Sequence, residues 1–362
     1  MQQQPWIGKP STDIFFILMP PFFCLLFIIL FPGLFQNSKG IPDASWVILI
    51  LLIDVAHVYS TLYRTYFDKV AFKKQSQILL TIPMAGFIVG VILYSVSSLL
   101  FWRVLAYVAV FHFIRQQYGF MRVYSRKDKQ HKIFRWIDTV AIYYAALYPI
   151  LYWHLDGPRN FNWFTENDFL YLQSAAFLSL FTWLYYFVIA VYLGKEIYNA
   201  VRYNIINIPK TLIILGTLVS WYFGIVFFNG DMAFTLLNVV SHGIPYMALV
   251  WLYGRKNYTK PGESNRFLAI IFSRYGIFLF LGVLFLFAFI EEGLWDIAVW
   301  QEHRAIFGSD SLTGISLPEK ALAFVVPLLA LPQITHYILD GFIWKIRNEE
   351  FKWNNEINLN KE

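Results

Sequence analysis

Four of the seven histidines lie inside apolar stretches long enough to cross a membrane, each in a different stretch: His57, His112, His242 and His336. The first basic residues after these stretches lie 7, 10, 13 and 9 residues further on, at Arg64, Arg122, Arg255 and Lys345. At the helical rise of about 1.5 Å per residue, the four rings occupy a layer roughly 9 Å thick. Because imidazole binds transition metals, this common depth predicts a metal site if the four helices are neighbours.

Two carboxylates accompany the histidines. Asp54 and Asp340 each lie within one helical turn of a histidine in the same stretch, so the helical period places them on its face. A carboxylate there can ligate the metal directly or fix the orientation of the imidazole. We interpret both as catalytic candidates.

A third ionisable side chain, Arg115, follows His112 by three residues. A charged group at the centre of a membrane helix costs about 2.5–3.5 kcal/mol on insertion scales. We therefore expect Asp54, Asp340 and Arg115 to face the protein interior. Arg115 is a further catalytic candidate, either pairing with a carboxylate or binding an anionic headgroup. Around the first histidine the polar residues form one stripe with steps of three and four, namely Asp54, His57, Thr61, Arg64 and Asp68.

The amino-acid composition indicates that these helices lie in a membrane. Hydrophobic residues make up 58% of the 362 residues, charged residues only 14%, and the mean hydropathy is +0.50, which excludes an ordinary soluble domain. We predict an all-α, polytopic integral membrane helix bundle forming a single domain over residues 1–362, with a kink at Pro20 and Pro21. Its ten expected spans are 13–35, 43–63, 77–100, 104–124, 134–153, 171–193, 209–228, 232–253, 267–290 and 320–344.

The basic residues alternate along the chain. Of the 29 Lys and Arg, 22 fall in one set of connections and termini and five in the opposite set. The positive-inside rule then places both termini in the cytoplasm of a multi-pass protein of the cell membrane. We expect the basic loop 125–135 to meet anionic lipid rather than nucleic acid. The outer connection 291–319 begins with Glu291 and Glu292, which we expect to be solvated.

Three interpretations of the intramembrane polar residues remain open at this stage. The first is a metal site with the four histidines as ligands, where iron is favoured and zinc and copper are alternatives, since the single cysteine excludes a thiolate set. The second is a proton- or ion-coupled transporter that uses the same His, Asp and Arg groups. The third is a structural role, in which the polar side chains hydrogen-bond between helices. A metal-free lipid-modifying transferase is a further possibility.

Two segments resemble a known family. Residues 335–344, THYILDGFIW, are similar to the closing motif of bacterial Brp/Blh-type carotene dioxygenases, and residues 241–251, SHGIPYMALVW, to their penultimate histidine motif. His57 and His112 correspond in order to the family's two early histidines. The family's second histidine of the penultimate motif is replaced here by Tyr246, and the family's residues adjoining the early histidines are absent.

The resemblance implies a polytopic membrane oxygenase in which histidines hold a non-haem iron. Together with the residues, it predicts a metal-dependent oxidoreductase with O₂ as co-substrate. Its substrate is expected to be a lipid or isoprenoid that enters from the bilayer. The sequence identifies no redox partner.

Overall fold

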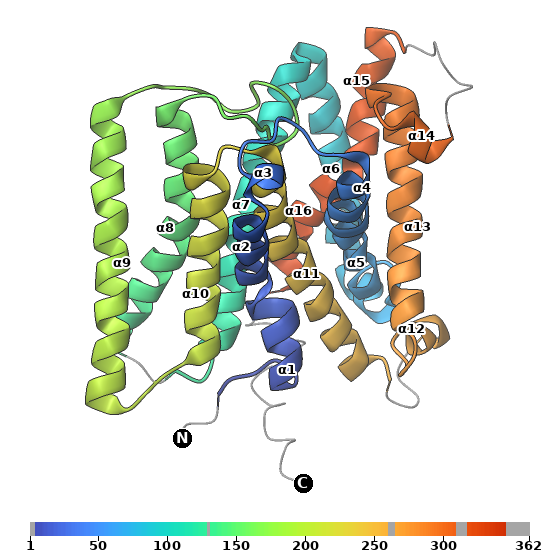
Figure 1. The fold of residues 1–362 in the computed structure, drawn as a ribbon. Helices are drawn as coiled ribbons and strands as arrows, with labels where there is room; N and C mark the ends of the chain where they lie inside the picture. Colours follow the sequence, from blue (N-terminus) through green and yellow to red (C-terminus); the bar gives the residue numbers. More distant parts are fainter. Residues whose placement is uncertain (1–3, 129–130, 260–264, 309–316, 345–362) are drawn as a thin grey trace.

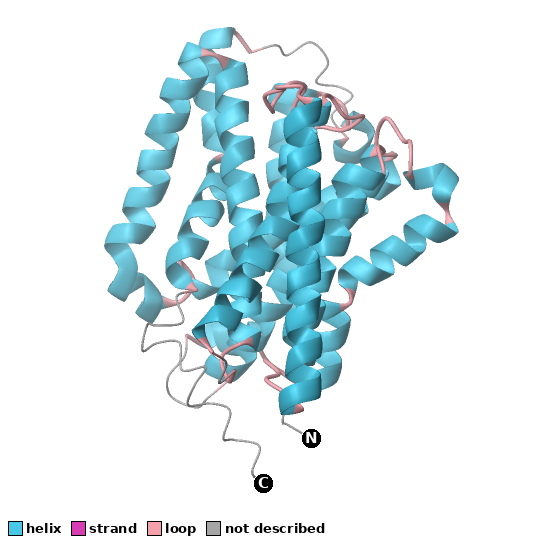
Figure 2. Cartoon of the chain, turned by 90° about the vertical axis from the view of Figure 1, so that its left-hand side faces the viewer, coloured by secondary structure: helices cyan, strands magenta, loops and turns pink. Residues whose placement is uncertain are grey.

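The computed structural model describes residues 4–128, 131–259, 265–308 and 317–344, and the regular structure within these ranges is helical (Figure 2). In chain order the α-helices are α1 (Pro10–Asp13), α2 (Pro20–Leu30), α3 (Pro32–Phe35), α4 (Asp43–Trp46), α5 (Ala56–Arg64), α6 (Lys69–Val96), α7 (Ser98–Tyr124), α8 (Lys132–Asp156), α9 (Ala175–Tyr203), α10 (Ile208–Trp221), α11 (Asp231–Asn257), α12 (Arg266–Ile271), α13 (Ile277–Trp295), α14 (Arg304–Phe307), α15 (Glu319–Leu329) and α16 (Leu331–Ile343). Segments with π-helical hydrogen bonding adjoin some of them: η1 (Ile14–Leu18), η2 (Val47–Val55), η3 (Tyr222–Phe227) and η4 (Asp296–Trp300).

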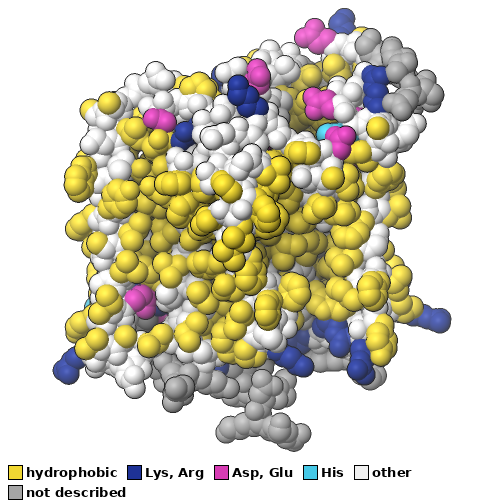
Figure 3. Space-filling model, viewed as in Figure 1, with side chains coloured by type: hydrophobic (Ala, Val, Ile, Leu, Met, Phe, Trp, Pro, Cys, Tyr) yellow, Lys and Arg dark blue, Asp and Glu magenta, His cyan; other side chains and the backbone are white. Residues whose placement is uncertain are grey.

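Among the described residues, eight helices are long and apolar enough to cross a membrane, and a bent pair makes a ninth. Hydrophobic side chains cover the middle of the face shown in Figure 3, and Lys and Arg gather at its lower edge. The prediction of an all-α, multi-pass membrane protein is confirmed. The eight spans are Asp43–Arg64, Lys69–Val96, Ser98–Tyr124, Ala175–Tyr203, Ile208–Phe227, Asp231–Asn257, Ile277–Trp300 and Glu319–Ile343, and the pair is Pro10–Leu18 with Pro20–Leu30.

The first span bends where the sequence predicts a kink. Its two halves meet at an angle of 53° before Pro20, whose missing N–H interrupts the helical hydrogen bonds. The predicted span 134–153 lies within α8, which is 25 residues long but is not among the helices apolar enough to count as a span. Tyr, Trp and an internal proline, Pro149, lower the hydropathy of α8. The count of ten spans therefore stays a prediction.

Two predicted boundaries differ from the structure. The window 77–100 runs past the end of α6 at Val96, because Ser97 leaves helical geometry and caps α7. The window 267–290 crosses a turn between α12 and α13, where the polar sequence 273–276 interrupts the helix. Helix α13 also continues into η4, so the segment that begins at Glu291 is helical rather than an outer loop.

The connections alternate between the two ends of the bundle, so α5, α7, α11 and α16 run in the same direction (Figure 1). Helices α5 and α16 pack against each other, as do α5 and α11, and α7 and α16. These are the helices that carry the four intramembrane histidines.

A buried network of charges joins α8, α9 and α10. Lys210, which is fully buried, lies 3.2 Å from carboxylate oxygens of Asp128, Asp138 and Glu196. Lys195 also contacts Asp138 and Glu196. The five side chains neutralise most of their charge locally, which is what allows them to be buried.

Removing the central lysine tests whether this network holds the three helices together. We expect Lys210→Met to lower the free energy of unfolding by about 3–5 kcal/mol, because three buried carboxylates lose a cation. Thermal unfolding in detergent, followed by circular dichroism, measures the effect. Lys73→Met, at an exposed position of α6, is the control and should unfold like the parent protein. Equal unfolding temperatures for the two variants would contradict the assignment.

Candidate metal centre

The polar stripe on α5 exists, but it is shorter than the sequence indicates. His57, Thr61 and Arg64 are all buried on the side of α5 that faces α11 and α16. The helix ends at Arg64, so Asp68 does not extend the stripe. Its carboxylate instead accepts hydrogen bonds from two N–H groups at the start of α6.

The four intramembrane histidines converge. We call His57 (α5), His112 (α7), His242 (α11) and His336 (α16) the histidine cluster. One potential ligand nitrogen from each ring lies within 4.8 Å of the corresponding atoms of the other three, and each side chain is at most 3% exposed. Neighbouring ring centroids are 4.6–5.0 Å apart. The predicted common depth therefore corresponds to a shared position in space.

The spacing fits a single metal ion after small rotations. Nitrogens bound to one ion at about 2.1 Å lie no more than about 4.2 Å apart. The observed limit of 4.8 Å exceeds this by a few tenths of an ångström. A shift of this size is within the range of side-chain rotation.

Five ring nitrogens of the histidine cluster are buried without a hydrogen-bond partner: Nε2 of His57, His112 and His336, and both nitrogens of His242. Each such group costs about 1–3 kcal/mol, so five cost about 5–15 kcal/mol. That range equals the whole stability of a typical domain. A single water donates only two hydrogen bonds, whereas one cation accepts a lone pair from all four rings. The cluster therefore has the ligand types of a metal site and ring nitrogens that lack a hydrogen-bond partner.

The remaining contacts orient the rings. Nδ1 of His57 lies 3.3 Å from the carbonyl oxygen of Ile53, and Nδ1 of His336 lies 2.7 Å from Oγ1 of Thr61. With these positions occupied, Nε2 of both rings is directed to the centre of the cluster. The ring of His242 is held differently, stacked on Phe113 at 3.5 Å between centroids.

Asp340 lies where two of the histidines meet. Its carboxylate oxygens are 3.9 Å from Nε2 of His112 and 3.7 Å from Nδ1 of His336. Tyr246 donates a hydrogen bond of 2.6 Å to the carboxylate, and its hydroxyl also lies 3.0 Å from Oγ1 of Thr61. The carboxylate is thus fixed beside the cluster by a chain of hydroxyl groups.

Asp54 and Arg115 have different surroundings from Asp340. Asp54 Oδ1 is 3.8 Å from Nδ1 of His57, and its side chain is about a third exposed, toward a cavity. Arg115 does not face the interior as expected. It is exposed on α7, hydrogen-bonded at 2.5 Å to Tyr143 and placed against the ring of Tyr118. The structure therefore groups both carboxylates with the histidine cluster and separates Arg115 from it.

Gly243 allows α11 to approach α5 closely. A Cβ atom at this position would lie 2.9 Å from Cγ2 and 3.1 Å from the carbonyl oxygen of Ile53, the group that orients His57. It would also lie 3.4 Å from Nδ1 of His57. The glycine beside His242 is therefore needed for the spacing of two ligands.

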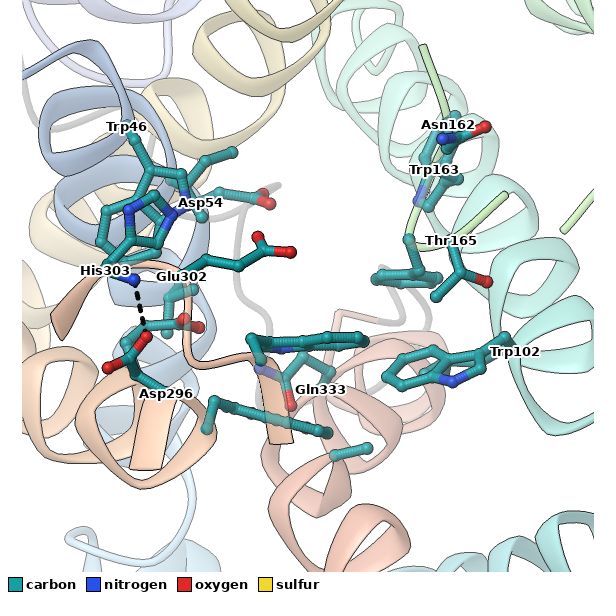
Figure 4. Close-up of a pocket in the computed structure, with 18 of the residues that line it drawn as sticks. Trp46, Asp54, Trp102, Asn162, Trp163, Thr165, Asp296, Glu302, His303 and Gln333 are labelled. Carbon is teal, nitrogen blue, oxygen red and sulfur yellow. Dashed lines mark hydrogen bonds between the residues drawn. The ribbon is translucent and has the colours of Figure 1, made fainter. Parts of the chain in front are cut away.

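A cavity of about 480 Å³ lies on one side of the histidine cluster, between η2, η4, the 162–166 loop and α16 (Figure 4). Its walls combine tryptophans with carboxylates, and among the described residues no Lys or Arg lines it. In Figure 4 the Asp54 and Glu302 side chains point into the open space, with Trp102 and Trp163 across from them. Asp54 and Tyr337 connect the cavity to the cluster, since Tyr337 lies 5.0 Å from the ring of His112.

Asp168 shapes the loop that covers this cavity. Its buried carboxylate accepts backbone hydrogen bonds from Trp163, Phe164 and Thr165. Burial raises the pKa of the Asp168 carboxyl group, and the three N–H groups oppose that rise. The loop is therefore held by one carboxylate.

A second space reaches the histidine cluster from the side of the bundle. This groove also measures about 480 Å³ and lies between α5, α6 and the α15–α16 pair. His336 lines it, together with mostly aliphatic side chains and no charged residue. A polar cavity and an apolar groove thus approach the same four imidazoles.

Glu291 is a residue near the site that the sequence did not reveal. The expected solvated position is wrong, because Glu291 is only 4% exposed. Its carboxylate accepts hydrogen bonds from Tyr59 at 2.6 Å, from Trp295 at 3.3 Å and from Gln333. Glu291 thereby joins α13 to α5 and α16, the helices of two ligands. The only signal in the sequence is its distance of seven residues from Leu284 and three from Ala288, both buried on the same face of α13.

Comparisons of this chain with protein-family models, with curated proteins and with solved structures find no match. The geometry of the histidine cluster is consequently the basis for any functional assignment.

Loss of a ligand provides the first test of the site. We expect His242→Ala to lower the affinity for bound metal at least about 100-fold, since removing even an outer contact to a ligand costs 10–100-fold. Elemental mass spectrometry of dialysed, tag-free protein measures the metal per chain. His154→Ala is the control, because His154 is hydrogen-bonded to Tyr107 and to the carbonyl of Ile150 outside the cluster. An unchanged metal content in His242→Ala would contradict the site.

The close approach at Gly243 provides the second test. We expect Gly243→Ala to weaken metal binding about 10–100-fold without unfolding the protein, because the added methyl group displaces the backbone next to two ligands. Gly119→Ala is the matched control, since no atom lies within 4 Å of a Cβ built at Gly119. Metal titration of both variants checks this expectation. Identical affinities would show that the spacing at Gly243 does not govern the site.

Proposed function

We propose that this protein is a membrane-embedded, metal-dependent oxidoreductase that acts as an oxygenase on a lipid or isoprenoid substrate. The observation that carries the proposal is the meeting of four buried imidazoles, which bring one possible ligand nitrogen each within 4.8 Å of the others, while five of their ring nitrogens lack a hydrogen-bond partner. A structural role for the histidines would leave them hydrogen-bonded to neighbouring helices, as buried polar groups normally are. Their unmet bonding instead supports a bound ion.

Non-haem iron is the metal we assign to the histidine cluster, with zinc and copper as the alternatives. An all-nitrogen set of imidazoles suits each of the three. Four protein ligands close the tetrahedral shell of zinc, whereas an octahedral iron keeps open positions for a substrate. When bound, the iron would supply redox chemistry with O₂ as co-substrate.

The surrounding residues support catalysis through what they orient and exclude. Tyr246 and Thr61 hold Asp340 beside two ligands, so Asp340 is assigned to orient them or to complete the metal shell. Asp54 is assigned to the same role for His57, at the end of the polar cavity. Arg115, exposed on α7, is assigned to a lipid headgroup at a distance from the cluster.

The finer features of the topology belong to this proposal as well. We infer ten spans with α8 included, both termini in the cytoplasm and a location in the cell membrane, on the distribution of Lys and Arg along the sequence. The short resemblance of segments 335–344 and 241–251 to carotene dioxygenases agrees with the chemistry, although carotene itself is not implied.

The central test combines metal analysis with oxygen uptake. Tag-free protein should contain about one iron per chain, because the four imidazoles form one site. In lipid nanodiscs with a chemical reductant, it should consume O₂, measured with an oxygen electrode. His336→Ala should lose both the iron and the uptake, and His303→Ala, in the wall of the polar cavity, should retain the iron.

The transporter alternative makes the opposite predictions. A proton- or ion-coupled carrier would work without a transition metal and would move charge across proteoliposome membranes. Full function of iron-free protein, with electrogenic transport that depends on Asp54, would contradict the oxygenase and favour the carrier.

A further inference from the structure

Along the groove between α5, α6 and the α15–α16 pair, the exposed fraction of the lining side chains falls from the outer rim to the inner floor. At the rim, Leu80, Met84 and Leu328 are 53–64% exposed on the membrane-facing surface. At the floor, Val58, Thr61, Thr335 and His336 are at most 9% exposed. The groove therefore leads from the lipid-facing surface directly to a ligand of the histidine cluster.

Two features of α6 shape the groove. Pro83 cannot donate the backbone hydrogen bond that Leu79 would otherwise accept, and the hydroxyl of Tyr66 donates to that carbonyl instead, at 2.7 Å. Further along α6, a Cβ atom at Gly86 would lie 2.7 Å from Ile334, and one at Gly90 would lie 2.9 Å from Pro327. The helix is thus pressed against α15 and α16 beyond Met84, which closes the groove at that end.

The open end of the groove is directed toward the basic end of α6. Lys69 and Lys73, both exposed, lie at the start of the helix, and Lys73 precedes Leu80 by seven residues. Seven residues span at most about 10 Å along α6, which is kinked at Gln75 within this segment. A lipid with its headgroup at these lysines could therefore extend its hydrocarbon chain to the rim at Leu80 and Met84.

The groove also defines which part of such a molecule reaches the metal. Its lining contains no Asp, Glu, Lys or Arg, so an ionic headgroup would lose its hydration without a compensating partner. A hydrocarbon chain loses nothing on leaving the surrounding lipid. The floor is suited to a chain and unsuited to a headgroup.

Building on the proposed function, we propose that the substrate is an acyl lipid with an anionic headgroup, and that its hydrocarbon chain is the part that reaches the histidine cluster. The chain enters between α5 and α6 and lies against Thr61, Thr335 and His336. The headgroup remains at the basic end of α6, near Lys69 and Lys73.

Photolabelling tests this route in the intact protein. The probes are phosphatidylglycerol and phosphatidylcholine, each with a diazirine at the end of one acyl chain, in nanodiscs of otherwise unlabelled lipid. Labelled residues are mapped by peptide mass spectrometry. We expect labels on Val58, Thr61 or Thr335, which a chain in the surrounding bilayer cannot reach because these side chains are buried. Phosphatidylglycerol should label them more than phosphatidylcholine does.

A matched pair of variants separates the groove from the general lipid surface. Met84→Trp should reduce labelling of the floor about tenfold, because the larger side chain fills the rim of the groove and blocks the chain's entry. Val89→Trp, at a similarly exposed position of α6 outside the groove, should leave it unchanged. Lys69→Gln combined with Lys73→Gln should remove the preference for phosphatidylglycerol.

The outcomes distinguish this inference from the proposed metal chemistry. Absence of floor labelling, or equal labelling in Met84→Trp and Val89→Trp, would overturn the entry route. Equal labelling by the two lipids would overturn the headgroup assignment. Metal content is measured on the same samples. Floor labelling in metal-free protein would support the groove while contradicting the oxygenase, and metal without floor labelling would do the reverse.

Discussion

Burial of unpaired imidazole nitrogens is the constraint on which the centre of this protein depends. Four rings from four helices meet where no protein group hydrogen-bonds to their inner nitrogens. Such an arrangement is unfavourable by an amount comparable to the stability of a domain unless something binds there. The residues around the rings increase the constraint, because Ile53, Thr61 and Phe113 hold the imidazoles in place and prevent them from turning to other partners.

The rest of the fold maintains this convergence. Gly243 brings α11 to α5, and Glu291 ties α13 to Tyr59 and Gln333 on the helices of two ligands. The charge network around Lys210 lies away from the cluster and joins α8, α9 and α10. The bundle therefore contains buried polar regions of at least two different kinds. In the network each cation is matched by anions, whereas in the histidine cluster the nitrogens remain unmatched.

The sequence predicts the depth of the histidines but not the faces of their helices. The depth of each histidine in the membrane follows from the number of residues between it and the first basic residue after its apolar stretch. The prediction that the four rings share one layer is consistent with their close approach in the structure. The sequence predicts Arg115 to face the protein interior, but Arg115 lies on the exposed face of α7. Phe111 and Arg115 are four residues apart and both exposed, whereas His112 and Gln116 share the inner side, where Gln116 hydrogen-bonds to the carbonyl of His242. On α7, residues adjacent in sequence therefore lie on different faces of the helix. The packing of neighbouring helices determines which of these faces is buried.

Partners that are distant in the chain account for the other differences. Tyr246 stands where the resembling family has a second histidine, and its hydroxyl instead holds Asp340, 94 residues away. The burial of Glu291 is not evident from the sequence because two of its three hydrogen-bond donors, Tyr59 and Gln333, come from α5 and α16. No local pattern encodes such contacts.

The cavity and the groove beside the histidine cluster differ in the kind of molecule they can hold. This difference follows from the residues that line each space. The cavity carries carboxylates and tryptophans, so it favours water and cations and disfavours anions. The groove is free of charge and opens among lipid-facing side chains, so it favours hydrocarbon. Val58 lines both spaces, and His57 lies one residue before it. The four imidazoles thus occupy the boundary between a polar and an apolar compartment. A hydrocarbon can approach the histidine cluster from one side and water from the other, without either having to cross the bundle.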